Sequence, residues 1–247
     1  MPAKDMVAGR GERRSTPLGT SIFVGLRAID PFLQYHLLSA VPLAGLLAKT
    51  GLSTRPSTNL LSSIGLDAFR STIFAMSLGS ALKHIIWIAY ISNEAMYPGG
   101  AAIICAFNTV FNSINSILAT TDLSSQVFPG QLYLGAALYV TGILVELVSE
   151  LQRKWFKDDP KNQGKPYGGG LFGWARSINY GGYTLWRGGY ALAAGGPAWG
   201  LLAGSMLAYD FATRAIPVMD DYCSKRYGAA WQEVKKKVPY RLLPFLY

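Results

Sequence analysis

The sequence predicts an all-α protein, a polytopic membrane bundle of about six transmembrane helices with a cytosolic C-terminal tail. Half of the 247 residues are hydrophobic and only 15% are charged, whereas about a quarter of the residues of a soluble domain are charged. Apolar runs of about 20 residues, the length that crosses a bilayer, recur between short polar segments. The same composition excludes a disordered chain, which combines low hydrophobicity with high net charge.

The apolar runs that we interpret as spans are residues 31–47, 72–91, 101–120, 131–148, 181–194 and 197–218. Arg27, Asp30 and Pro31 interrupt the apolar stretch before the first run, so we expect residues 22–30 to lie at the membrane interface. Gly195-Gly196-Pro197 joins the last two runs, a spacing typical of a helical hairpin. The basic, aromatic tail after residue 223 cannot span.

The distribution of charge predicts the orientation. Of the 23 Lys and Arg residues, 17 lie in three segments, residues 1–30, 152–176 and 225–241. Six spans place all three segments on one side, which the positive-inside rule makes cytosolic. Both termini are therefore expected in the cytosol. We divide the chain into a polar N-terminal arm (1–20), N-terminal transmembrane helices (21–148) and a C-terminal domain (149–247).

Several function classes are not expected. The net charge of +9 lies in loops between apolar runs, so it does not predict the basic face of a nucleic-acid-binding domain. Cys105 and Cys223 lie in unlike contexts and form no metal pattern, so no metal is expected. The sequence contains no serine–histidine–acid set or Walker loop, and its pattern leaves the catalytic residue unknown. The expected partners are membrane lipids and a small-molecule substrate in the lipid phase.

Two stretches can bind a cofactor. Glu150, Lys154 and Lys157 fall on one helix face by their spacing, and two cations on one face can hold a phosphate; a juxtamembrane basic patch is the alternative interpretation. A Gly-rich run follows, which allows a ligand to approach the backbone closely. Its residues Arg176, Asn179 and Tyr180 can hydrogen-bond a ribose or a carboxamide. Glycines also let membrane helices pack closely.

A polar stripe crosses the third span. Asn108, Asn112 and Asn115 recur at helical spacing inside an apolar run. Polar side chains within membranes are rare and tend to mark sites, so this stripe is a candidate substrate site. Interhelical hydrogen bonding is an equally good interpretation.

The C-terminal third carries recognisable motifs. They are Gln152-Arg-Lys-Trp-Phe-Lys157, Asp159-Pro160, Asn162, Gly164, Gly170-Leu-Phe, Asn179-Tyr-x-Gly182, and the ending from Lys225-Arg-Tyr-Gly-x-x-Trp231 to Val238-Pro-Tyr-Arg-Leu-Leu-Pro-Phe-Leu-Tyr247. Together they resemble the steroid 5-alpha-reductase and sterol reductase superfamily, closest to its branch of uncharacterised function. The resemblance covers roughly residues 146–247.

This resemblance implies an integral membrane oxidoreductase of the endoplasmic reticulum. Such an enzyme reduces a carbon–carbon double bond of a steroid, sterol or polyprenyl-type lipid with NADPH. The resemblance makes residues 149–247 the cofactor-binding domain. The cofactor-binding residues are then Glu150, Lys154, Lys157, Arg176, Asn179, Tyr180, Asp220 and Arg241.

The chain departs from the family at several positions. The family's His, Pro and carboxylate are replaced by Ser177, Ile178 and Tyr183, and a tail Tyr is replaced by Val234. Two alternatives to the reductase therefore stay open. One is an isoprenylcysteine-methyltransferase-like enzyme that uses S-adenosylmethionine, although such enzymes carry His where this chain has Ser177. The other is a non-catalytic lipid-binding membrane protein of the same fold.

Overall fold

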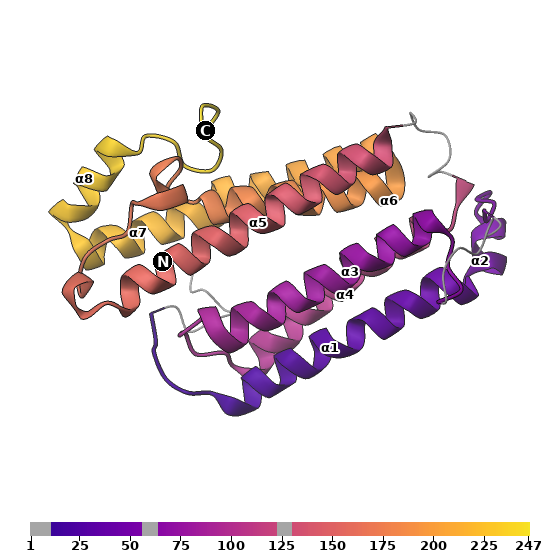
Figure 1. Ribbon diagram of the computed structural model, residues 1–247, viewed down its shortest axis with the longest axis horizontal. Helices are drawn as coiled ribbons and strands as arrows, with labels where there is room; N and C mark the ends of the chain where they lie inside the picture. Colours follow the sequence, from indigo (N-terminus) through magenta and orange to yellow (C-terminus); the bar gives the residue numbers. More distant parts are fainter. Residues whose placement is uncertain (1–10, 56–63, 123–129) are drawn as a thin grey trace. The chain divides into compact units, whose positions relative to one another are not determined.

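The computed structural model describes residues 11–55, 64–122 and 130–247, and its elements in these ranges are helical (Figure 1). The β-type pairing found among them is an isolated bridge between Thr54 and Thr121. The all-α prediction is confirmed. The described chain forms two compact units: unit 1 contains Ala137–Gly189 and Leu201–Tyr247, and unit 2 contains the described residues before Ala137 together with Tyr190–Gly200.

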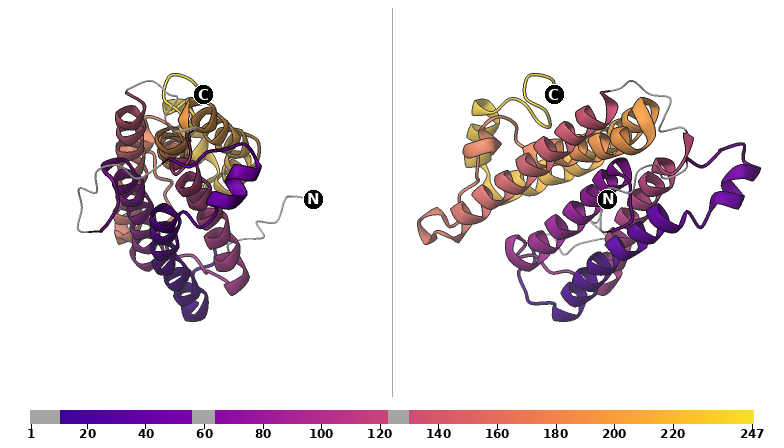
Figure 2. Two further views of the ribbon diagram at one scale, coloured as in Figure 1. Left: turned by 90° about the vertical axis from the view of Figure 1, so that its right-hand side faces the viewer. Right: turned by 45° about the vertical axis from the view of Figure 1, so that its right-hand side comes forward.

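Unit 2 is built on three long helices that lie side by side (Figures 1 and 2). They are α1 (Pro17–Ala40), α3 (Ala68–Ile86) and α4 (Pro98–Ala119). The short α2 (Ala44–Lys49) follows α1, and one turn of π-helix, η1 (Trp87–Ile91), extends α3. Proline begins α1 and α4, a position where its missing N–H is not needed.

The segment before α1 is partly ordered. Residues 1–10 of the predicted N-terminal arm lie outside the described residues. The backbone N–H of Ala95 donates to the carbonyl of Glu12 at 2.9 Å, and the Tyr97 hydroxyl donates to the Glu12 carboxylate at 2.6 Å. These contacts hold the chain that enters α1 against the loop between η1 and α4.

Helix α1 differs from the prediction. It is continuous from Pro17 to Ala40, so the expected break before Pro31 and the expected single element over residues 31–47 are wrong. Arg27 and Asp30 do not interrupt the helix because they turn inward. They are 0% and 2% exposed and form an ion pair of 3.3 Å.

The exposed side chains of residues 26–33 in α1 are apolar. Ile29 and Phe32 are 63% and 75% exposed, whereas Gln34 is fully buried beside the ion pair. An amphipathic helix of a soluble protein has its apolar face toward the core. Polar side chains that face the bundle interior are typical of helices in membranes.

Unit 1 contains α5 and a helical hairpin, apart from the first residues of α5 and the hairpin tip. Its elements are α5 (Gln131–Asp158), the 3-10 turns η3 (Pro160–Asn162) and η4 (Gly170–Gly173), α6 (Ile178–Asp210), the π-helical turn η5 (Phe211–Ala215), α7 (Ile216–Tyr227) and α8 (Ala229–Lys237).

Helix α6 folds back on itself at Gly196. This residue has φ 89° and ψ 178°, a conformation that glycine adopts without steric cost. In unit 1 the two arms meet where the ring of Tyr180 stacks on that of Phe211, with 4.6 Å between their centroids. The predicted hairpin is confirmed. Its second arm continues through η5 and α7 to Tyr227, beyond the predicted end at residue 218.

Two glycines allow α5 and the first arm of α6 to approach closely in unit 1. A Cβ on Gly142 would lie 2.4 Å from the backbone nitrogen of Trp186, and one on Gly182 would lie 2.7 Å from that of Glu146. Small residues at such crossings let membrane helices pack backbone against backbone. The crossing brings the carboxylates of α5 against α6.

Four segments of the described chain are long and apolar enough to cross a membrane. They are Ala68–Ile91, Pro98–Ala119, Gln131–Asp158 and Ile178–Tyr227, the last of which contains both arms of the hairpin. At 1.5 Å per residue, the 28 residues of α5 extend about 42 Å, which exceeds the hydrocarbon core of about 30 Å. By length and composition, these helices are consistent with an integral membrane protein.

Candidate functional site

A pocket of about 360 Å³ lies in unit 1 where α7 begins. Its lining residues are Arg176, Ile216, Pro217, Asp220, Asp221, Ser224 and Arg241. Three of the predicted cofactor-binding residues, Arg176, Asp220 and Arg241, are brought together here from distant parts of the sequence. The volume falls within the range of pockets that bind small molecules.

The segment after α8 fixes Arg176. One guanidinium nitrogen, Nη1, donates to the carbonyl of Val238 at 2.5 Å and to that of Pro239 at 3.1 Å. The backbone N–H of Arg176 donates to the carbonyl of Tyr240 at 3.0 Å. The guanidinium is therefore held in place by backbone groups and needs no carboxylate partner to be oriented.

Two cationic and two anionic side chains line the pocket. Burial lowers the pKa of Arg176, an effect that the charge of Asp220 opposes and that of Arg241 reinforces. Arginine nevertheless stays protonated in proteins. Asp221 forms an exposed ion pair of 2.6 Å with Lys225. Because the charges of the lining balance, the pocket suits a zwitterionic ligand better than a polyanion.

Helix α8 positions Asp220. The indole N–H of Trp231, which is buried, donates to Oδ1 of Asp220 at 2.8 Å. The ammonium of Lys235 lies 3.4 Å from Oδ2. These contacts fix the carboxylate at the wall of the pocket.

Glu150 and Asn179 meet where α5 contacts α6. The side-chain amide of Asn179 donates to Oε1 of Glu150 at 2.8 Å, and Arg153 donates to the same oxygen at 3.1 Å. Glu150 and Asn179 are 5% and 7% exposed. The structure thus joins two of the predicted site residues in one buried contact, apart from the side chains that line the pocket.

The two predicted phosphate-binding lysines contact groups of the protein itself. The ammonium of Lys154 lies 2.8 Å from the carboxylate of Asp158. Lys157 donates to the carbonyl of Lys165 and, at 3.0 Å, to the hydroxyl of Tyr227, whose ring centroid lies 4.6 Å from the ammonium. Both ammonium groups therefore already have partners within the protein, with which a phosphate would have to compete.

A buried cluster around the hairpin lies outside the predicted set of site residues. Arg187 is fully buried and donates to the hydroxyl of Tyr183 at 3.3 Å. Its guanidinium carbon lies 4.3 Å from the ring centroid of Trp186, whose indole N–H donates to Glu146 at 2.7 Å. The available signal was an arginine inside an apolar helix. Asp221 and Ser224 were missed as well, although they follow Asp220 closely on the same helix.

The asparagine stripe lies in unit 2 and its side chains contact the helix bundle. Asn112 donates to Asp30 at 2.7 Å, and Asn115 accepts from the indole of Trp199 at 2.6 Å. Asn108 donates to the carbonyl four residues before it at 2.7 Å. Interhelical hydrogen bonds, one of the two interpretations left open, account for the contacts of Asn112 and Asn115.

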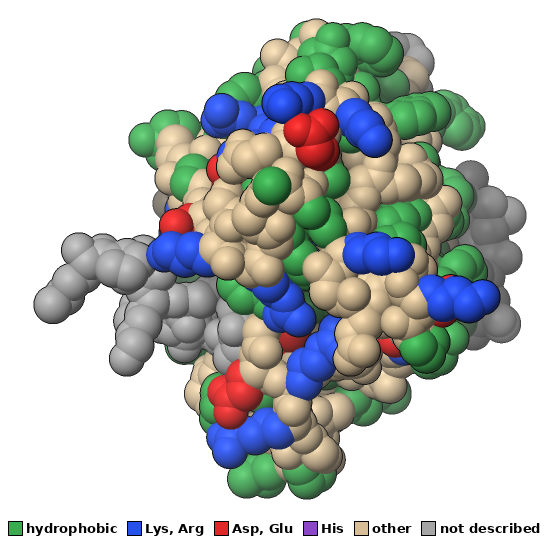
Figure 3. All heavy atoms as spheres, turned by 90° about the vertical axis from the view of Figure 1, so that its left-hand side faces the viewer, with side chains coloured by type: hydrophobic (Ala, Val, Ile, Leu, Met, Phe, Trp, Pro, Cys, Tyr) green, Lys and Arg blue, Asp and Glu red, His purple; other side chains and the backbone are tan. Residues whose placement is uncertain are grey.

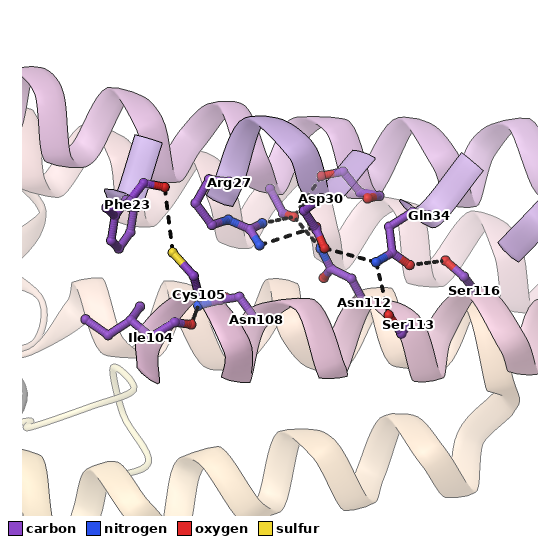
Figure 4. Close-up of polar contacts among 12 residues, drawn as sticks. Phe23, Arg27, Asp30, Gln34, Ile104, Cys105, Asn108, Asn112, Ser113 and Ser116 are labelled. Carbon is purple, nitrogen blue, oxygen red and sulfur yellow. Dashed lines mark hydrogen bonds and ion pairs between the residues drawn. The ribbon is translucent and has the colours of Figure 1, made fainter. Parts of the chain in front are cut away.

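Asn112 belongs to a larger buried network (Figure 4). From α1, Gln34 donates to Asp30 at 3.0 Å and to Ser113 of α4 at 3.2 Å, and it accepts from Ser116 at 2.8 Å. Arg27 points the same way and pairs with Asp30. The network joins α1 to α4 through the polar atoms of both helices.

Comparison with known proteins gives the chain a family. The family described as "Protein of unknown function (DUF1295)" matches residues 102–238, more than half of the chain. The chain belongs to the DUF1295 family. A protein of Ustilaginoidea virens named "Probable O-methyltransferase ustE" is 34% identical over 242 residues, which cover 92% of this chain and 85% of that protein. The DUF1295 match includes Arg176 and Asp220 of the pocket, whereas Arg241 lies beyond it.

Proposed function

We propose that this protein is a membrane O-methyltransferase that binds S-adenosylmethionine in the pocket lined by Arg176, Asp220 and Arg241. The observation that carries the proposal is the balance of charge in this pocket. S-adenosylmethionine has a carboxylate, an ammonium and a sulfonium. The arginines are suited to the carboxylate, and Asp220 and Asp221 to the cationic groups. The name of the relative from Ustilaginoidea virens supports the same chemistry.

The NADPH-dependent reductase of the sequence analysis has less support. NADPH carries several phosphate charges, which call for a site where cations outnumber anions. The lining of the pocket is balanced, and the lysines expected to hold phosphate contact Asp158 and Tyr227. We propose that the resemblance to the steroid 5-alpha-reductase superfamily reflects a shared fold with different chemistry.

In this proposal the residues of the pocket act by binding and orienting. When bound, S-adenosylmethionine would supply an electrophilic methyl group: the acceptor oxygen would gain the methyl, the carbon–sulfur bond would break to leave S-adenosylhomocysteine, and the acceptor's proton would pass to water. Arg176 is held by backbone carbonyls and Asp220 by Trp231, so both charges are in place before a ligand arrives. Such preorganisation lowers the entropic cost of reaching the reactive geometry.

We further propose six membrane crossings, formed by α1, α3, α4, α5 and the two arms of the hairpin. The buried polar face and exposed apolar faces of α1 support its inclusion. Six crossings and the positive-inside rule place the pocket on the cytosolic side, where a water-soluble cofactor reaches it. The acceptor would be a small molecule dissolved in the lipid, and the endoplasmic reticulum follows from the resemblance alone.

Thermal unfolding of the full chain in detergent tests the cofactor. A ligand at a hundred times its Kd stabilises the folded state by about 2.7 kcal/mol. We expect S-adenosylmethionine and S-adenosylhomocysteine to raise the Tm. Asp221→Asn should raise the ligand concentration needed for the same Tm increase at least tenfold. Asp210→Asn is the matched control, because Asp210 forms an exposed ion pair with Arg214 on the same hairpin arm.

The same assay distinguishes the reductase. Lys154→Gln/Lys157→Gln should leave the response to S-adenosylmethionine unchanged. Stabilisation by NADPH that this double substitution removes would overturn the proposal and establish the phosphate site of the reductase. No response to any of these ligands would favour the non-catalytic membrane protein.

A further inference from the structure

The end of unit 1 that carries α8 is strongly basic. Residues 225–247 contain six basic residues and one acidic residue. Figure 3 shows Lys and Arg side chains at several places on one face, with Asp and Glu side chains beside some of them. The pocket uses Arg241, and Lys235 lies near Asp220. Lys236 and Lys237 have no role in the proposed cofactor site.

The fold of α8 directs its charge outward. Trp231 in α8 and Val238 directly after it are buried, at 6% and 4% exposure, on the side that packs against the rest of unit 1. Lys236 and Lys237 are exposed. Lys236 pairs with Glu233 at 2.8 Å, but both side chains are largely exposed, and such a pair is weak in water. The helix therefore keeps a cationic outer face.

Two large apolar side chains stand outside the loop that follows α8. Phe245 and Leu246 are 83% and 80% exposed. The loop is closed by the backbone N–H groups of Arg241 and Leu242, which both donate to the carbonyl oxygen of Tyr247 at 2.8 Å. Phe245 itself has φ 66°, a conformation unfavourable for a residue with a side chain. The loop thus holds two apolar groups away from the core of unit 1.

We propose that α8 and the loop after it form a binding surface for anionic phospholipid headgroups. We call this the α8 surface and define it as Lys236, Lys237, Phe245 and Leu246. Ammonium and guanidinium groups donate charge-assisted hydrogen bonds to phosphate and carboxylate oxygens. Exposed aromatic and aliphatic side chains beside basic ones are typical of segments that lie in the membrane interface. Charge complementarity therefore selects an anionic leaflet, and this inference does not depend on the proposed methyl transfer.

Lipid binding to the full chain in nanodiscs tests the α8 surface. Native mass spectrometry would compare phosphatidylserine with phosphatidylcholine retained by the protein. We expect Lys236→Gln/Lys237→Gln to lower the preference for phosphatidylserine about tenfold or more, since each surface cation contributes separately to attraction. Lys161→Gln/Lys165→Gln is the control, because it removes two exposed charges from the segment between α5 and α6.

A second measurement separates binding from damage to the fold. Hydrogen exchange of residues 239–247 should slow in discs that contain phosphatidylserine, and high salt should reverse this, because surface charge attraction is screened. Phe245→Ser/Leu246→Ser should lose this protection without a change in Tm in phosphatidylcholine discs. No preference for phosphatidylserine, or equal losses in the two lysine double variants, would overturn the proposal.

Discussion

The buried network of unit 2 and the pocket of unit 1 hold their charged side chains in different ways. In unit 2, Arg27 and Asp30 are enclosed by each other, by Gln34 and by Asn112. In unit 1, the charges of Arg176, Asp220 and Arg241 border a pocket, and backbone carbonyls or an indole hold the first two in place. Intramembrane polarity alone therefore does not identify a binding site. A site also needs charged groups that are already oriented and still border open space.

The largest effect is expected from a substitution that breaks the buried network of unit 2. Asp30→Leu leaves the guanidinium of Arg27 buried without its carboxylate, and removing one partner of a buried pair destabilises a protein by about 3–5 kcal/mol. Arg27→Met/Asp30→Leu removes both charges and should recover most of this loss. Unfolding of the variants in detergent, followed by circular dichroism, would measure both. A double variant as unstable as Asp30→Leu would show that the loss of stability does not come from the unpaired guanidinium of Arg27.

The next prediction compares how closely the backbone is packed around a glycine in α5 and around one in α1. Gly142→Ala in α5 forces a methyl group against the backbone of Trp186 and should cost about 1–3 kcal/mol of unfolding free energy. Gly25→Ala in α1 meets no atom within 4 Å. It should be neutral or stabilise by up to about 1 kcal/mol, because alanine favours the helix. Equal effects in an unfolding assay would contradict the close crossing of α5 and α6.

A smaller effect tests how α8 prepares the pocket. Trp231→Phe removes the hydrogen bond to Asp220 and should weaken binding of S-adenosylmethionine by about 0.5–1.5 kcal/mol, or two- to tenfold in Kd. Trp174→Phe alters an indole that is 64% exposed and should leave the Kd unchanged. Titration calorimetry of both variants decides the point. A weaker Kd in both would trace the effect to the aromatic content of unit 1 and not to Asp220.

The smallest effect concerns an exposed ion pair. Arg214→Gln breaks the pair with Asp210, whose side chains are 57% and 40% exposed. Exposed pairs contribute about 0.2–1 kcal/mol, so the Tm should fall by only a few degrees, and less at high salt. A collapse of the fold would mean that the hairpin arm depends on this pair in a way that its exposure does not indicate.

The sequence predicted the features that depend on local chemistry. Hydropathy located α3, α4 and α5, and Gly196-Pro197 located the turn of the hairpin. Helix α1 was missed because Arg27 and Asp30 resemble a break until α4 supplies Asn112 opposite them. Which face of a helix is buried depends on its neighbours, and single-chain periodicity does not contain that information.

The candidate site was predicted in part. Motif resemblance selected Arg176, Asp220 and Arg241, which the fold brings to one pocket. The partners of Lys157 were not predictable, because Tyr227 lies 70 residues away in the sequence. A cationic helix face has the same sequence pattern whether it holds a phosphate or contacts the protein itself. The comparison with a named O-methyltransferase then shifted the balance between two cofactors that sequence reasoning had already identified.

Equilibrium binding of labelled S-adenosylmethionine to the unmodified chain in lipid nanodiscs is the decisive test of the proposed cofactor. We expect saturable binding that S-adenosylhomocysteine displaces, that NADPH does not displace and that Asp221→Asn weakens. Binding of NADPH in place of S-adenosylmethionine would overturn the proposed cofactor, because the balanced charges of the pocket would then be holding a polyanion.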